Sequence, residues 1–329
     1  MSFYIKVRVL FFFIILLLTV GCAKGSQGET ISETRLHFDT YCTITIHDTV
    51  DPAVLNEAFD FIDEFESLLS MTVEGSDIWR INNARGEPVP VDMRTIEVII
   101  AGVEFGKLTG GMFDITIGRL SRLWDYSLSY VPSDTELEEA RSTVNYLQVV
   151  IDDFIVRLVN PGARIDLGAI AKGYIGDKLA AFLIERGITS ALIDFGGDVI
   201  TIGSRHDGKP WRIALREPFG EINDWLGVIE VSGVSVISSG IYERQFELNG
   251  TLYHHILDPN TAMPVKSDVV SATVVSESAM VGEGLSTSLI LMGSSNAEEL
   301  FDKVTGFIGA VLVLDTGEIL IYGDIDLIK

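Results

Sequence analysis

A loop-to-helix junction between Asp166 and Tyr174 combines small residues with one lysine. Small residues at a helix start leave backbone N–H groups accessible, and such groups bind phosphate oxygens. Lys172, in the first turn of the predicted helix, can add a point charge for a diphosphate. The segment has neither the Gly-Lys-Ser/Thr of a P-loop nor a dinucleotide-binding glycine pattern. Close packing of a helix start explains these residues equally well.

Two adjacent histidines, His254 and His255, lie in a predicted strand, in a chain with five histidines. Successive side chains of a strand point to opposite faces, so at most one of the two faces a given site. This favours a general base over a metal site that uses both rings. A solvent-exposed histidine beside a buried one is the simpler alternative.

Residues 282–287 place a carboxylate and hydroxyls on one predicted helix start. Glu283 and Thr287 are one helical turn apart and therefore share a face. Together with a backbone carbonyl and ligand phosphates, such hard oxygens suit Mg²⁺. Alternatively, Glu283 only complements the helix dipole.

Residues 110–118 begin with two glycines, which let a backbone approach a ligand closely. Phe113 could pack on a planar ring, and Asp114 could hold its polar edge. A helix end leading into a strand accounts for the same residues.

The chain is acidic and apolar, with 329 residues, a formal net charge of −23 and 47% hydrophobic residues. The charge argues against a nucleic-acid partner, which clustered lysine and arginine would bind. The apolar content excludes a disordered chain, and the length predicts one large domain or two intimate ones.

The N-terminus has the features of a targeting segment. Residues 1–21 carry two basic side chains and an apolar run that is too short to span a bilayer, and Cys22 follows Gly21. This pattern resembles a bacterial lipoprotein signal and predicts a lipid anchor on Cys22. We therefore expect a flexible tether over residues 22–33, a folded domain over residues 34–329, and a location in the bacterial periplasm or cell envelope. Cys42 would be the remaining thiol, so no internal disulfide is expected.

The elements that must position these residues alternate between helices and strands. Apolar periodicity predicts helices over residues 55–69, 95–108, 170–186 and 280–292. Residues 36–46 are predicted as one strand, and further strands as short hairpins, including a turn at Asn249-Gly250. Ser133 and Glu136 predict a capping box. The fold class expected is α+β with mainly antiparallel sheets.

Taken in order, these segments resemble the ApbE family of FAD:protein FMN transferases across about residues 35–310. The resemblance rests on motifs at residues 113–116 with 123–124, 166–174 with Asp177, 196–198, 211–218, 238–242, 254–259, and 285–287 before 292–293.

The resemblance implies two intimately packed lobes with a ligand cleft between them. It implies FAD contacts from Phe38, Met112, Phe113, Asp114, Lys172, His255 and Ile256, and Mg²⁺ ligands from the Ala169 carbonyl, Glu283 and Thr287. His255 would take the proton from a threonine or serine of an exported client flavoprotein. FMN would be transferred from FAD and AMP released.

Two alternatives remain open. Water could replace the acceptor hydroxyl, which would make the protein an FAD pyrophosphatase. The third hypothesis is a non-catalytic FAD-binding lipoprotein, because Glu283 stands where the family usually has aspartate and Asp39 where it usually has glycine.

Overall fold

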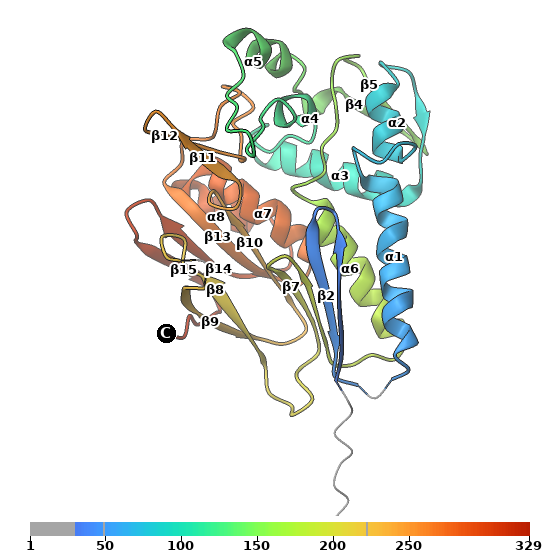
Figure 1. The fold of residues 1–329 in the computed structure, drawn as a ribbon, viewed down its shortest axis with the longest axis vertical. Coiled ribbons are helices and arrows are strands. Elements are labelled where there is room, and N and C mark those ends of the chain that lie inside the picture. The colour runs from blue at the N-terminus through green and yellow to red at the C-terminus, as the bar shows by residue number, and fades with distance from the viewer. Residues whose placement is uncertain (1–29, 49, 222) are drawn as a thin grey trace, which may run out of the picture.

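The computed structural model describes residues 30–48, 50–221 and 223–329, and its centre is an eight-stranded antiparallel sheet (Figure 1). The strand order is β1-β2-β6-β7-β10-β13-β14-β15. These strands are β1 (Ile31–His37), β2 (Thr40–Ile46), β6 (Ala191–Phe195), β7 (Asp198–Ile202), β10 (Ser235–Gly240), β13 (Val269–Ser276), β14 (Phe307–Leu314) and β15 (Ile319–Gly323). Every neighbouring pair is antiparallel, which confirms the predicted fold class. The division into two lobes with a cleft between them stays a prediction.

Both faces of the central sheet are covered. The helices α1 (Ala53–Leu69), α6 (Ala171–Glu185) and α7 (Ala279–Met292) pack together, and α7 lies on β10 and β13. The hairpin of β8 (Trp211–Arg216) and β9 (Trp225–Val231) covers the other face. Val274 therefore joins the helical core and Val275 the β8–β9 core, as expected for successive strand residues.

The N-terminal strand prediction was wrong, because residues 36–46 form parts of two strands. A tight turn at Phe38 and Asp39 reverses the chain, with φ of 50° and 57°. Hairpin turns with two positive φ angles usually carry asparagine or glycine, and this turn carries neither. The expected tether also ends too late, because β1 already begins at Ile31. Cys42 is a buried, free thiol on β2, whereas Cys22 lies outside the described residues.

A second group of elements packs above the sheet in the view of Figure 1. It contains α2 (Asp77–Asn83), α3 (Met93–Leu108), α4 (Gly118–Ser121), α5 (Asp134–Arg141) and the small sheet of β3 (Val89–Pro90), β5 (Ile155–Leu158) and β4 (Val149–Asp152). The predicted capping box is confirmed, because Ser133 and Glu136 exchange both hydrogen bonds at the start of α5.

The remaining predicted hairpin is confirmed as well. β11 (Gln245–Leu248) and β12 (Thr251–His254) are joined at Asn249 and Gly250, both with positive φ. Its apolar face packs on α4 and α5, which fixes the segment after β12 against that group. The last helix is α8 (Ala297–Asp302), and the strands β14 and β15 follow it in the chain. Among the described helices, none has the length and apolar content to cross a bilayer.

Candidate active site

A cavity of about 520 Å³ lies where the β1–β2 turn, the end of α1, the start of α6 and α7 approach one another. All ten residues that the sequence predicts for FAD and Mg²⁺ line this cavity. They are Phe38, Met112, Phe113, Asp114, Ala169, Lys172, His255, Ile256, Glu283 and Thr287. The fold therefore brings together segments that are far apart in the chain.

A buried ionic cluster of Lys172, Asp198 and Glu283 forms one wall of the cavity. Lys172 Nζ donates a hydrogen bond to Asp198 Oδ2 and lies 3.6 Å from Glu283 Oε1. Burial alone would lower the pKa of Lys172, but the two carboxylates outweigh it and raise that pKa above its usual value. Lys172 is therefore a permanent cation at physiological pH. The excess of negative charge around it leaves room for a further cation.

Glu283 reaches this cluster from the second turn of α7, which begins at Ala279, one residue before the predicted start. Its side chain is 4% exposed, and Oε2 accepts a hydrogen bond of 2.7 Å from Gly173 N. Burial raises the pKa of Glu283, and the charge of Lys172 opposes that rise. At this depth Glu283 does more than complement the helix dipole.

Close packing of α6 against α7 sets these positions. A Cβ on Gly173 would lie 2.3 Å from the carbonyl oxygen of Ala279, so only glycine permits this approach. Asp177 on α6 caps α7, accepting hydrogen bonds from Ser278 Oγ and from the backbone N–H groups of Ala279 and Met280. Asp177 is therefore structural, as is the close packing at Gly173.

The predicted metal ligands are all oxygen donors at this wall. Thr287 Oγ1 lies 3.2 Å from Ser239 Oγ, and the Ala169 segment precedes α6. Oε1 of Glu283 has the Lys172 ion pair, at 3.6 Å, as its polar contact. A carboxylate, a hydroxyl and a carbonyl are hard ligands, which fit Mg²⁺.

The two histidines separate, although the prediction that both lie in a strand was wrong, because β12 ends at His254 and His255 follows it. His254 is buried, and its Nε2 donates to the carbonyl oxygen of Val265 at 3.2 Å. His255 lines the cavity, and its Nδ1 has no hydrogen-bond partner among the described residues. Burial, together with the charge of Arg244, lowers the pKa of His255 to about 4. His255 is therefore neutral at physiological pH and able to accept a proton.

The segment around Met112 forms another wall of the cavity. Phe113 is almost fully buried and packs on Phe105, with ring centroids 5.4 Å apart. Asp114 accepts hydrogen bonds from Thr116 N and Oγ1 through one oxygen and from Tyr146 N through the other. In this structure Asp114 fixes its own loop, and its contact with FAD stays a prediction.

Sequence reasoning did not assign several charged groups in the same cavity to the site, among them Asp198, Glu243 and Arg244. Asp198 belongs to a quoted motif, but nothing in the sequence pairs it with Lys172. Glu243 follows β10 without any motif signal. Burial raises the pKa of Glu243 to about 7, against the lowering effect of Lys172. Glu243 is thus able to exchange protons near neutrality, whereas His255 does so only in acid.

The fold and the cavity define an α+β protein with a buried ionic cluster in the wall of a large cavity. The ApbE family model matches residues 38–312. The FAD:protein FMN transferase of Vibrio cholerae serotype O1 is 32% identical over 286 residues, covering 84% of this chain and 85% of the relative. That of Treponema pallidum is 28% identical over 317 residues, covering 88% of each.

Solved structures agree with this assignment. The crystal structure of the ApbE protein of Thermotoga maritima has a TM-score of 0.81 and 32% identity, covering 90% of this chain and 97% of that one. The flavin transferase ApbE from Vibrio cholerae has a TM-score of 0.78 and 27% identity, covering 89% and 96%. The chain belongs to the ApbE family, and the curated relatives named here are flavin transferase enzymes.

Proposed function

We propose that this protein transfers the FMN moiety of FAD to a serine or threonine hydroxyl of an exported client flavoprotein and releases AMP. The observation that carries the proposal is the meeting of Lys172, Glu283 and His255 in one cavity. Membership in a family whose curated relatives are FAD:protein FMN transferases supports it.

The group transfer needs a cation that faces the diphosphate, a base that accepts the proton of the hydroxyl, and a metal ion that neutralises charge. The client hydroxyl oxygen forms a bond to the FMN phosphorus, the bond from that phosphorus to the bridging oxygen breaks, and AMP leaves with that oxygen. Lys172 faces the charge of the diphosphate and of the leaving phosphate. His255, which is neutral and has a free ring nitrogen, accepts the proton of the hydroxyl.

Ala169, Glu283 and Thr287 would hold Mg²⁺ through a carbonyl, a carboxylate and a hydroxyl oxygen. A bound Mg²⁺ supplies charge neutralisation to the diphosphate. Ser239, in contact with Thr287 Oγ1, keeps that hydroxyl oriented. Gly173 does the same for Glu283 through its N–H group.

The anchor and the location are part of the same proposal. Cys22 would carry lipid and hold the enzyme at a membrane of the bacterial periplasm or cell envelope, where it would meet exported clients. Labelling of growing cells with a fatty-acid analogue tests the anchor, with Cys22→Ala as the control. Label retained in Cys22→Ala would refute it.

The test of function uses purified protein, FAD and Mg²⁺, with and without a client peptide that contains an acceptor threonine. We expect AMP and a flavin-labelled peptide in equal amounts. AMP without any acceptor would instead establish the pyrophosphatase. Tight FAD binding with no AMP under either condition would establish the non-catalytic alternative.

A further inference from the structure

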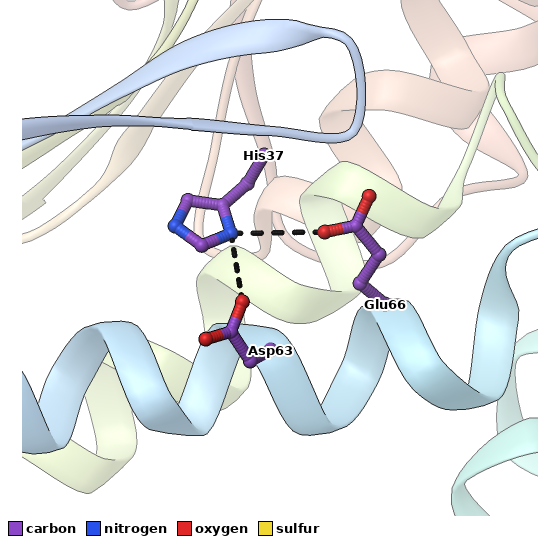
Figure 2. Close-up of side chains that lie close together, drawn as sticks. All are labelled: His37, Asp63 and Glu66. Carbon is purple, nitrogen blue, oxygen red and sulfur yellow. Dashed lines mark ion pairs between the residues drawn. The ribbon is translucent and has the colours of Figure 1, made fainter. Parts of the chain in front are cut away.

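A second cluster of potential metal ligands lies outside the ionic wall, between the β1–β2 hairpin and α1. Figure 2 shows His37 descending from the hairpin toward Asp63 and Glu66, which rise from α1. His37 Nδ1 lies 3.2 Å from Asp63 Oδ1 and 3.7 Å from Glu66 Oε2. One donor atom from each side chain falls within 4.8 Å of the other two.

The imidazole of His37 is buried beside the two carboxylates and forms no hydrogen bond among the described residues. Its side chain is 6% exposed and stacks on Phe59, with ring centroids 5.5 Å apart. Neither ring nitrogen has a hydrogen-bond partner in the part of the chain that the structure describes. Nδ1 is close to both carboxylates, in contacts that are ion pairs and not hydrogen bonds (Figure 2). A buried polar atom without a partner is costly, so the position calls for a ligand.

The two carboxylates have no lysine or arginine partner in the described parts of the chain, and their recorded ion-pair contacts are with His37. Within residues 30–48, 50–221 and 223–329, neither Asp63 nor Glu66 forms an ion pair with lysine or arginine. Their neighbour Glu64 differs, because it pairs with Arg94 at 3.1 Å. Two carboxylates without a lysine or arginine partner in these ranges, beside a buried imidazole nitrogen, are a donor set for a divalent cation.

We propose that His37, Asp63 and Glu66 bind a divalent transition-metal ion such as Zn²⁺, which fastens the β1–β2 hairpin to α1. Two carboxylates neutralise the charge of the ion, and neutral His37 coordinates through Nδ1 with its proton on Nε2. Asp63 is 60% exposed, so the ion can enter from solvent and keep water as its remaining ligand.

The distances fit this kind of ion. Bonds of about 2.0–2.2 Å from zinc to nitrogen or oxygen place neighbouring tetrahedral donors about 3.3–3.6 Å apart. The measured separations of 3.2 Å and 3.7 Å bracket that range. The imidazole distinguishes this site from the all-oxygen set at Glu283, because nitrogen donors favour zinc-like ions and magnesium favours oxygen.

Glu66 connects the proposed metal site to the cavity, because its two carboxylate oxygens contact different parts of the hairpin. Its Oε1 accepts a hydrogen bond of 3.3 Å from Phe38 N, while its Oε2 faces His37. Phe38 and Glu66 both line the cavity. An ion held by Oε2 would therefore fix the turn that carries Phe38 and Asp39.

The test measures Zn²⁺ binding to the full chain in excess Mg²⁺. Asp63→Asn keeps the shape of an exposed side chain and leaves the cavity lining untouched. Asp60→Asn, an exposed carboxylate on the same helix, is the matched control. We expect Asp63→Asn to lose one equivalent of Zn²⁺ per chain, or to weaken it by more than about tenfold. Asp60→Asn should bind as the unaltered protein does.

Two further measurements separate this site from other histidines. Anomalous scattering at the zinc edge should give a peak between His37, Asp63 and Glu66. Zn²⁺ should also slow amide hydrogen exchange in the Phe38–Asp39 turn. Equal Zn²⁺ stoichiometry in Asp63→Asn and the unaltered protein would overturn the proposal. So would loss of the equivalent in His206→Asn, whose ring contacts His47 at 3.0 Å.

Discussion

The ionic cluster and the β1–β2 turn both line the cavity, but they differ in how firmly the surrounding structure holds them. Lys172, Asp198 and Glu283 are held by paired charges and by two helices in backbone contact. Phe38 and Asp39 form a turn with positive φ at both residues, and a single hydrogen bond of 3.3 Å ties Phe38 N to α1. The first wall is held by several buried contacts and the second by few, so we expect the second to adjust more readily when a ligand binds.

The largest effect on stability is expected at the contact between α6 and α7. Gly173→Ala places a Cβ 2.3 Å from the Ala279 carbonyl oxygen, and backbone cannot move aside easily. We expect a loss of more than about 3 kcal/mol in the free energy of unfolding, measured in urea, together with loss of FAD turnover. Gly176→Ala is the control, because its Cβ would meet the end of the Ile200 side chain. Equal stability of the two variants would contradict the account.

The next effect tests the charge balance of the ionic cluster. Lys172→Met leaves Asp198 and Glu283 buried without their cation, at a cost of about 3 kcal/mol in the free energy of unfolding. We also expect kcat/KM for FAD to fall by about 10²–10³-fold. Adding Asp198→Asn to Lys172→Met should restore part of the stability but none of the activity. A double variant less stable than Lys172→Met would show that the charges do not compensate one another.

The pH profile distinguishes the two groups able to accept the proton. If His255 is the base, kcat/KM falls as pH drops through about 4, because protonation removes its lone pair. A fall centred near 7 would instead point to one of the two buried glutamates of the cavity, Glu243 or Glu283, and loss of that fall in Glu243→Gln would assign it to Glu243. Replacing Glu243 with glutamine should leave the lower limb in place if His255 is the base.

The smallest effect belongs to the hairpin turn. Asp39→Gly relieves a positive-φ residue and removes a carboxylate from the cavity, so FAD binding should tighten while unfolding free energy changes by less than about 1 kcal/mol. Asp153→Gly is the matched control, because Asp153 has φ of 53° in a turn that does not line the cavity. FAD affinity that responds equally in both variants would remove Asp39 from the site.

The sequence predicted those elements of the fold that depend on residues close together in the chain. The apolar stripe of α1, the capping box at Ser133 and the turn at Asn249 each depend on neighbouring residues, and each is confirmed. The turn at Phe38 was missed because it has no glycine or asparagine. Local patterns could not reveal it.

The site residues also fall into those that the sequence could predict and those that it could not. Residues within ordered motifs, such as Lys172 and Glu283, could be proposed from their spacing and their resemblance to a family. The Lys172–Asp198 pair and the charge on Glu243 could not, because they depend on contacts between β7, β10 and α6. The His37 cluster could not be predicted for the same reason, because His37 ends β1 whereas Asp63 and Glu66 lie on α1.

The most direct test of the central claim is a crystal structure of the full chain with FAD and Mg²⁺. The account predicts the diphosphate within hydrogen-bond distance of Lys172 Nζ, with Mg²⁺ on Glu283 and Thr287 and His255 facing the FMN phosphorus. FAD seated elsewhere, or a diphosphate turned away from Lys172 and Glu283, would contradict it.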